Sequence, residues 1–295
     1  METKFKVDVG DVMRIPGLRR PWGGFPPFLT PVFFNKEVLV RYFYDPRYLC
    51  EFHSETYGTV YAKNFRFPFG INPNGKVVAW LGDLEKLPEP EQQYLLSENT
   101  ESDGDITSEF YDGQINCVFT SPIREIEIVL LKTKISEVFH DRYGFALFNN
   151  TKPSLDEVLQ MCSRCKRIVF NNQDDLKRFI SEWNESVVED IRGTNLKAWL
   201  KSNSVPFDEG LGSLKTLEVF TKQVLGDTNS LIAPLFYLND LRIWADHKGA
   251  EEKFIGVIKK LGLQNPSHAE LYSRLIEDVY SFFMNFFAIL DNPKS

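Results

Sequence analysis

The sequence predicts an α+β protein, with a mixed α+β domain in residues 1–150 followed by an all-α bundle in residues 151–295. Short runs rich in β-branched and aromatic residues, separated by turn residues, are confined to the first half. In the second half, apolar residues recur every three to four positions, and Gly or Pro separates the periodic stretches. With 43% hydrophobic and 25% charged residues, the composition is typical of a globular protein.

The first half begins with residues 1–35, which are rich in Pro, Gly and aromatic residues, and we expect an extended arm there that packs on the rest of the domain. Short helices are expected over 36–43, near 89–96 and near 134–142. Strands are expected within LCEFHS (49–54), GTVYAKNFRFPFGI (58–71), KVVAWLG (76–82), INCVFT (115–120) and REIEIVLLKT (124–133), with Asn-Pro-Asn-Gly at 72–75 as a hairpin turn and the acidic segment 97–113 as an exposed loop.

The pattern changes at FNNTKPS, residues 148–154, and we place the domain boundary near residue 150. Beyond it the apolar spacing predicts helices over 154–164, 173–200, 212–225, 230–247, 250–262 and 267–290. Four or five helices in a stretch of this length are typical of a compact bundle.

The charge distribution excludes one class of function. The net charge is −7, with 16 basic against 21 acidic residues in residues 1–150 and 18 against 20 in residues 151–295. A protein that grips duplex DNA through many phosphates carries a basic surplus. Any nucleic-acid site in this chain must therefore be local.

The most apolar run, VYSFFMNFFAIL at 279–290, is twelve residues long and falls short of the roughly 20 that cross a bilayer. The stretch METKFKVDVGDVMR has no apolar core of the kind that signal peptides carry. We therefore expect a cytoplasmic protein that does not enter the membrane.

The four cysteines are too few and too scattered for a disulfide framework. Cys162 and Cys165 form a Cys-x-x-Cys pair, and Cys50 with His53 forms a Cys-x-x-His pair, which together could supply the four ligands of a zinc site. The two pairs lie far apart in the sequence and in different expected domains. Packing of these cysteines in apolar cores is the favoured interpretation, and we expect no metal and no cofactor.

The segment LNDLRIWADHKG, residues 238–249, carries the strongest chemical signal. It places Arg242 and His247 five residues apart at the end of an apolar helix. An arginine can hold the charge that develops on an attacked phosphate, and a histidine with a pKa near 6.5 can move the proton.

This segment resembles the active-site motif of the HEPN superfamily of small helical ribonucleases, which often reads like Leu-Arg-Asn-x-x-Ala-His with a glycine soon after. LRIWADHKG matches the leucine, arginine, histidine and glycine, and departs from the pattern at Ile243 and Asp246. The resemblance covers the second half of the chain only. It implies a metal-independent endoribonuclease of a bacterial defence or toxin–antitoxin type, acting as a homodimer in which two motifs meet across a cleft.

In that hypothesis His247 is the general acid or base for attack by the RNA 2′-hydroxyl, and Arg242 holds the phosphate. Asp240 or Asp246 would orient the histidine across the dimer. One straight helix cannot direct both side chains at one point, since His247 lies about 140° around the helix from Arg242. The hypothesis therefore needs help from side-chain length, a loosened last turn or the second copy.

A structural interpretation explains the same residues. Arg242 and Asp246 are spaced as an ordinary i,i+4 ion pair, and His247 lies where cations interact favourably with the C-terminal end of a helix. The alternative function is thus a non-catalytic interaction protein whose helical half serves dimerisation or docking. In either case we expect the N-terminal domain to sense a signal or bind a partner protein.

Overall fold

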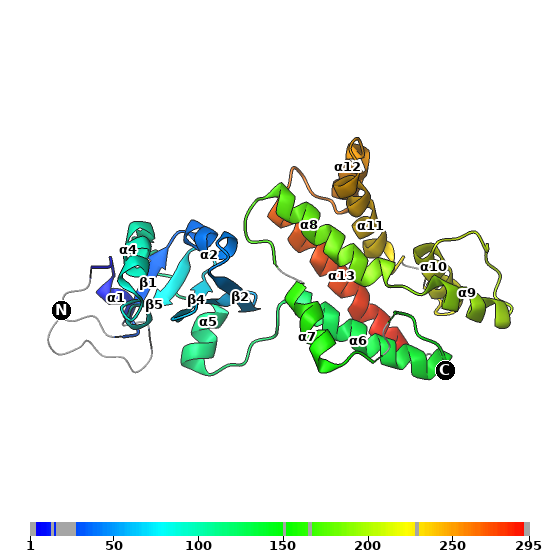
Figure 1. Ribbon diagram of the computed structural model, residues 1–295, viewed down its shortest axis with the longest axis horizontal. Helices are drawn as coiled ribbons and strands as arrows, with labels where there is room; N and C mark the ends of the chain where they lie inside the picture. Colours follow the sequence, from blue (N-terminus) through cyan, green and yellow to red (C-terminus); the bar gives the residue numbers. More distant parts are fainter. Residues whose placement is uncertain are drawn as a thin grey trace. The chain divides into compact units, whose positions relative to one another are not determined.

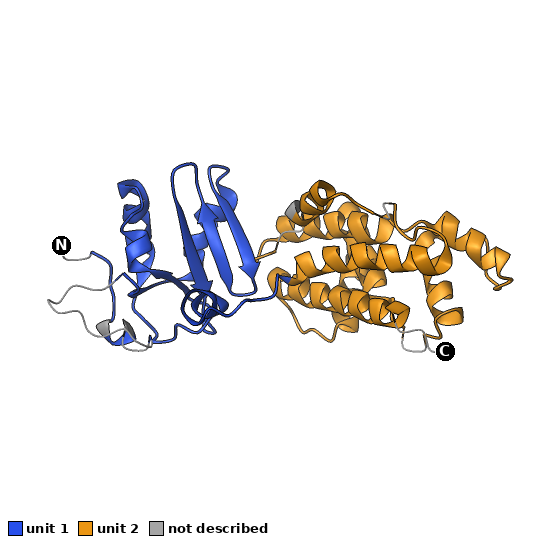
Figure 2. Cartoon of the chain, turned by 90° about the horizontal axis from the view of Figure 1, so that it is seen from below, with its two compact units in different colours: residues 1–123 blue, residues 124–295 orange. Residues whose placement is uncertain are grey.

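The computed structural model describes residues 4–12, 15, 28–149, 152–164, 167–227 and 230–291. The chain divides into two compact units, residues 1–123 and 124–295, and each is described by itself (Figure 2). This boundary lies earlier than the one expected near residue 150. The reason is the long helix α6 (Arg124–Tyr143), which packs along α13 (His268–Asp291) and so belongs to the helical unit.

The first unit is built on one antiparallel sheet, in agreement with the expected α+β class. Its strand order is β2-β3-β4-β5-β1-β6. The strands are β1 (Pro31–Phe34), β2 (Leu49–Ser54), β3 (Tyr57–Tyr61), β4 (Arg66–Ile71), β5 (Val77–Trp80) and β6 (Asn99–Thr100). The strands expected in 49–54, 58–71 and 76–82 are confirmed.

The turn expected at 72–75 is confirmed as well. The backbone N–H of Asn72 donates to the carbonyl of Lys76 at 2.9 Å, and Gly75 takes the left-handed conformation at φ 78° that favours glycine. Strand β1 lies inside residues 1–35, the segment expected to be an extended arm, of which residues 1–3, 13–14 and 16–27 lie outside the described residues. Its four residues are all buried between β5 and β6, which explains their run of apolar side chains.

Two of the expected strands are wrong. Residues 115–120 contain the end of a π-helical turn, η2 (Asp112–Asn116), and then irregular backbone. Residues 124–133 form the first half of α6. Ile128, Leu131 and Ile135 are buried at helical spacing, and this periodicity overrides the strand preference of the β-branched side chains.

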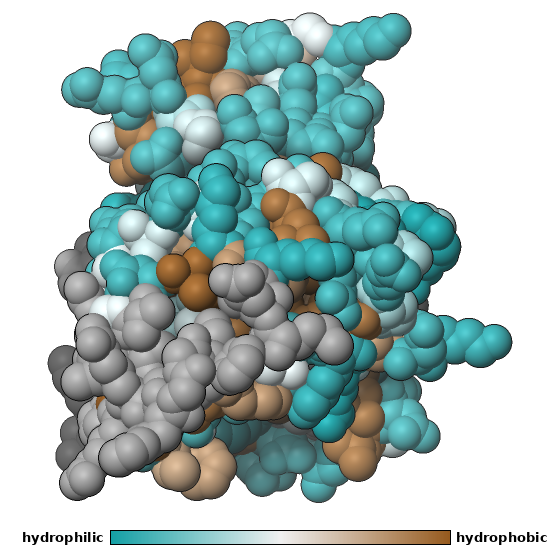
Figure 3. All heavy atoms as spheres, turned by 90° about the vertical axis from the view of Figure 1, so that its left-hand side faces the viewer, coloured by the Kyte–Doolittle hydropathy of each residue, from teal (hydrophilic) through white to brown (hydrophobic). Residues whose placement is uncertain are grey.

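Short helices flank the sheet of the first unit. They are α1 (Val9–Val12), η1 (Lys36–Leu39), α2 (Val40–Tyr44), α3 (Leu81–Leu84), α4 (Glu89–Glu98) and α5 (Glu109–Tyr111). The acidic segment 97–113 is only partly exposed, because Ile106 and Phe110 are buried against Trp80 and its neighbours. The face of the chain drawn in Figure 3 is mostly hydrophilic where it is coloured, with small separate hydrophobic patches.

A buried polar cluster ties α4 to α2. One oxygen of Glu91 accepts hydrogen bonds from Arg41 at 2.8 Å and from the Tyr48 hydroxyl at 2.6 Å. The other oxygen accepts from the Tyr42 hydroxyl at 3.1 Å. The Arg41 guanidinium also lies 4.6 Å from the centre of the Tyr94 ring. Burial, together with the Glu91 charge, raises the pKa of Tyr42 far above its usual value.

The second unit is all helical apart from one isolated bridge, within the residues described. Its helices are α6, α7 (Leu155–Arg164), α8 (Gln173–Asn184), α9 (Gly193–Ser202), α10 (Ser213–Gln223), α11 (Ala233–Asp246), α12 (Glu251–Lys260) and α13, with a π-helical turn η3 (Glu185–Glu189) between α8 and α9. The predicted helices are confirmed except that 173–200 is broken. A Cβ atom on Gly193 would lie 2.5 Å from Ser213 Oγ, so α9 can begin there only with glycine.

Helix α13 is the centre of this bundle (Figure 1). It packs along α6 and contacts α8 and α11, and α8 packs in turn on α11. Its apolar face includes Leu275, Phe282 and Phe286, all buried. The indole N–H of Trp183 donates to the Tyr272 hydroxyl at 3.0 Å inside this core. None of the helices in the described ranges is long and apolar enough to cross a membrane.

Candidate functional site

Helix α11 positions Arg242 and His247. Its buried face, which includes Leu238 and Leu241, packs into the bundle, and this leaves Arg242 on the flank of the helix with 37% of its side chain exposed. His247 is the first residue beyond the helix, where the backbone turns to an extended conformation at φ −121° and ψ 121°. The helix therefore ends before the histidine, while the His247 N–H still closes the last turn onto Ile243.

Two carboxylates hold the Arg242 guanidinium. Its Nε lies 2.9 Å from Asp246 Oδ2, and its Nη2 lies 3.3 Å from Glu189 Oε1. The same Glu189 oxygen accepts a hydrogen bond from the Asn184 side chain at 3.0 Å. The pairing with Asp246 follows from the i,i+4 spacing, whereas Glu189 comes from the π-helical turn and has no signal in the local sequence.

His247 is exposed, and its backbone N–H donates to the carbonyl of Ile243 at 3.0 Å. Its imidazole has no hydrogen-bond or ion-pair partner within the residues described. Asp246 is committed to Arg242, and Asp240 pairs with Lys253 at 2.9 Å and with Lys260 at 3.5 Å. Within one copy of the chain, neither aspartate orients the histidine.

The requirements of an enzyme are met only in part by a single copy. Arg242 and His247 both reach the surface, but Arg242 shares its charge with two carboxylates. The features expected of a non-catalytic pair, an Arg242–Asp246 ion pair and a histidine at the helix end, are those observed.

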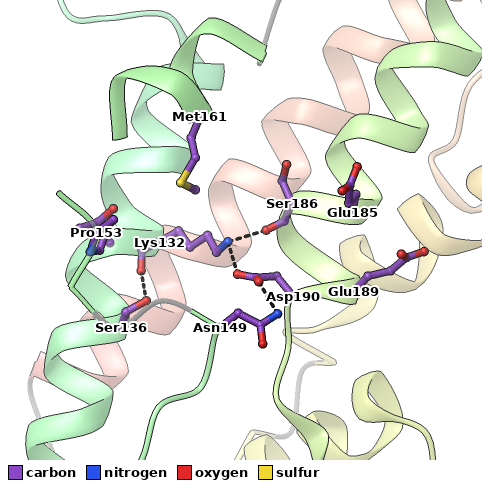
Figure 4. A pocket seen from close by; sticks show the side chains of 10 residues that line it. Lys132, Ser136, Asn149, Pro153, Met161, Glu185, Ser186, Glu189 and Asp190 are labelled. Atoms are coloured by element: carbon purple, nitrogen blue, oxygen red, sulfur yellow. Dashed lines mark hydrogen bonds and ion pairs between the residues drawn. The ribbon is translucent and has the colours of Figure 1, made fainter. Parts of the chain in front are cut away.

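A pocket of about 320 Å³ lies elsewhere in the same unit, between α6, the segment before α7, α7 itself and η3 (Figure 4). It is lined by Lys132, Thr133, Ser136, Asn149, Pro153, Met161, Glu185, Ser186, Glu189 and Asp190. The volume falls in the range of small-molecule sites. Glu189, which also binds Arg242, connects the wall of the pocket to the end of α11.

The floor of the pocket is an ion pair between the buried Lys132 and Asp190, whose side chain is 21% exposed. Lys132 Nζ lies 2.5 Å from Asp190 Oδ2 and donates to the carbonyl of Ser186 at 2.6 Å. The Asn149 amide donates to the other Asp190 oxygen at 2.6 Å, and the Phe148 ring lies 4.9 Å from Lys132 Nζ. π-Helical turns occur frequently at functional sites, and here η3 carries three of the lining residues.

Sequence reasoning missed this pocket because residues 124–133 were interpreted as a strand and 173–200 as one helix. One signal was available. Lys132 lies among the apolar positions of α6, next to Leu131, where a charged residue needs a buried partner.

The zinc alternative finds no support. Cys50 lies in β2 of the first unit and Cys162 in α7 of the second, and Cys165 lies outside the described residues. Burial raises the pKa of both the Cys50 and the Cys162 thiols, which favours their neutral forms. No group of three or more His, Cys, Asp or Glu side chains in the described part of the chain could hold a metal ion.

Comparison of the chain with models of protein families, with curated proteins and with solved structures finds no match.

Proposed function

We propose that this chain is a non-catalytic interaction protein whose helical unit serves as a dimerisation or docking module. The observation that carries the proposal is the double ion pairing of Arg242, by Asp246 and Glu189. A phosphate approaching Arg242 would meet two carboxylates, whose combined charge exceeds that of the arginine. In this proposal Arg242 fastens α11 to η3, and His247 ends the helix.

Helix α7 supports a docking role for this unit. Leu155 and Leu159 lie one turn apart on it, and they are 73% and 56% exposed. The half-buried side chains of Val158, Met161 and Cys162 pack against the core. An apolar stripe on an amphipathic helix is the kind of surface that an interface buries, and we assign it to a second copy of this chain.

The chain is accordingly expected to elute and sediment as a dimer, and Leu159→Asp is expected to shift it to the monomer, because two buried carboxylates would face each other near the two-fold axis. Ile255→Asp on α12 is the matched control, since Ile255 is 63% exposed and lies on another helix. Sedimentation velocity measures the change. A wild-type monomer, or equal dissociation by both variants, would contradict the assignment of α7.

A second candidate function is the metal-independent endoribonuclease that the HEPN resemblance implies. It is favoured by the exposed imidazole of His247, which has no partner among the described residues and lies at a point where the helix has already ended. The pairs that hold Arg242 are also weak. Arg242, Asp246 and Glu189 are 37%, 39% and 49% exposed, and exposed ion pairs contribute only about 0–1 kcal/mol. A homodimer that brings in a second motif is the form in which we would expect RNA cleavage, with Arg242 freed to bind the phosphate.

One assay separates the two functions. Mixed cellular RNA is incubated in EDTA with the wild type, with His247→Ala and with Lys248→Ala, a neighbouring exposed cation, after each variant is checked for folding. The interaction proposal predicts no cleavage above background by any of the three at a concentration where the chain is dimeric. Cleavage that only His247→Ala loses, by a factor of at least about 100, would establish the endoribonuclease instead.

A further inference from the structure

The pocket of Figure 4 offers a ligand mainly hydrogen-bond acceptors. Ser136 Oγ donates its proton to the carbonyl of Lys132 at 2.8 Å, and Thr133 Oγ1 donates its own to the carbonyl of Val129 at 3.1 Å. Two Lys132 donors are taken by Asp190 and Ser186. The two hydroxyl groups can therefore only accept hydrogen bonds from a ligand, through the lone pairs of their oxygen atoms.

The lining is also negatively charged. Among the described residues that line it, Lys132 is the one cation, against the three carboxylates of Glu185, Glu189 and Asp190. The Asp190 charge is compensated by Lys132, and Glu189 shares one oxygen with Arg242. Glu185 is exposed and its side chain has no hydrogen-bond or ion-pair partner among the described residues, so its charge is available to a ligand.

The opposite side of the pocket is apolar. Figure 4 shows Met161 and Pro153 on the side of α7 and the segment before it, facing the η3 side, from which Glu185 and Glu189 come. A ligand that fits has at least one strong cationic donor for the carboxylates and the hydroxyl oxygens. It also has an alkyl chain to cover the thioether and the proline ring. An anion would be repelled, and a neutral polyol would leave the Glu185 carboxylate without a counter-charge.

We propose that this pocket binds a small aliphatic polyamine, with one ammonium group on Glu185 and the alkyl chain along Met161 and Pro153. The assignment is independent of whether the chain cleaves RNA, because neither Arg242 nor His247 lines the pocket. It adds a small-molecule site to a unit for which the proposed function requires only protein contacts.

The test is calorimetric titration of the full chain with 1,5-diaminopentane and, in parallel, with 1,5-pentanediol, its neutral counterpart of similar shape. We expect saturable binding of one diamine per chain with a dissociation constant of about 1 mM or lower, and no binding of the diol. Glu185→Gln is expected to raise the dissociation constant of the diamine about tenfold, because the substitution removes one charge-assisted hydrogen bond.

Glu137→Gln is the matched control variant. Glu137 is an exposed carboxylate on α6 that does not line the pocket, and its substitution changes the net charge by the same amount. Unchanged binding by this variant, together with the loss in Glu185→Gln, supports the site. Absence of saturable diamine binding overturns the proposal. Equal weakening by both variants also overturns it, since that result would report general attraction to an acidic protein.

Discussion

Replacing Glu91 with glutamine is expected to lower the free energy of unfolding of the sheet unit by about 3 kcal/mol. Arg41, Tyr48 and Tyr42 all direct donors at the two Glu91 oxygens, and the carboxylate is almost fully buried. An amide presents one oxygen and one NH₂ group, so the tyrosine hydroxyl beside the NH₂ group would have to accept a hydrogen bond instead of donating one. The Arg41 charge would also lose its counter-charge in a partly desolvated place.

The full chain is unfolded in urea, and hydrogen exchange in peptides that cover β2 to β5 monitors the unfolding. The sheet unit is thereby followed separately from the helical unit. Glu89→Gln is the control, because Glu89 is exposed in the first turn of the same helix, and it is expected to change stability by no more than about 0.5 kcal/mol. A loss below 1 kcal/mol for Glu91→Gln would mean that the cluster contributes far less than its burial implies.

The strands of the sheet could be predicted where the local sequence alone carries a strand pattern. In the segment from Leu49 to Gly82, β-branched and aromatic runs alternate with turn residues, and that pattern predicted three strand segments. The structure divides the middle one, 58–71, between β3 and β4. Strand β1 was not predictable in the same way, because Pro31–Phe34 lies in a Pro- and Gly-rich stretch. Its pairing with β5 is a long-range contact.

Helix α6 shows why local propensity fails at a domain boundary. Its first ten residues favour a strand when read alone. The helical spacing is recognised only when Ile128 and Ile135 are considered together with Phe139, which lies beyond the window that was interpreted as a strand. Once α6 is helical, it joins the bundle, and the boundary moves from residue 150 to 123/124.

For the candidate site, the i,i+4 rule was sufficient for the Arg242–Asp246 pair and for the position of His247 at the helix end. It was not sufficient for Glu189, which approaches Arg242 from a turn more than fifty residues earlier in the sequence. The pocket depends on the same turn. A π-helical turn has no sequence signature that separates it from the α-helix around it, and so both features required the fold.

Among the charged residues of the helical unit, Lys132 is the one whose replacement we expect to lower the free energy of unfolding most. Its ammonium group is buried and holds three elements together, through Asp190, the Ser186 carbonyl and the Phe148 ring. Lys132→Met keeps the alkyl chain and removes the charge, which leaves Asp190 with only the Asn149 amide. We expect a loss of about 3 kcal/mol in the free energy of unfolding of this unit.

The double variant Lys132→Met, Asp190→Leu separates the charge effect from packing. Replacing both members of a buried ion pair by apolar side chains is often neutral, so we expect it to recover at least about 2 of the 3 kcal/mol. Lys134→Met, at an exposed position of the same helix, is expected to stay within about 0.5 kcal/mol of the wild type. Urea unfolding monitored by the fluorescence of the tryptophans, with hydrogen exchange in peptides around Trp183, provides the free energies. If the double variant is no more stable than Lys132→Met, the cost arises from the lost Ser186 and Phe148 contacts rather than from an uncompensated Asp190.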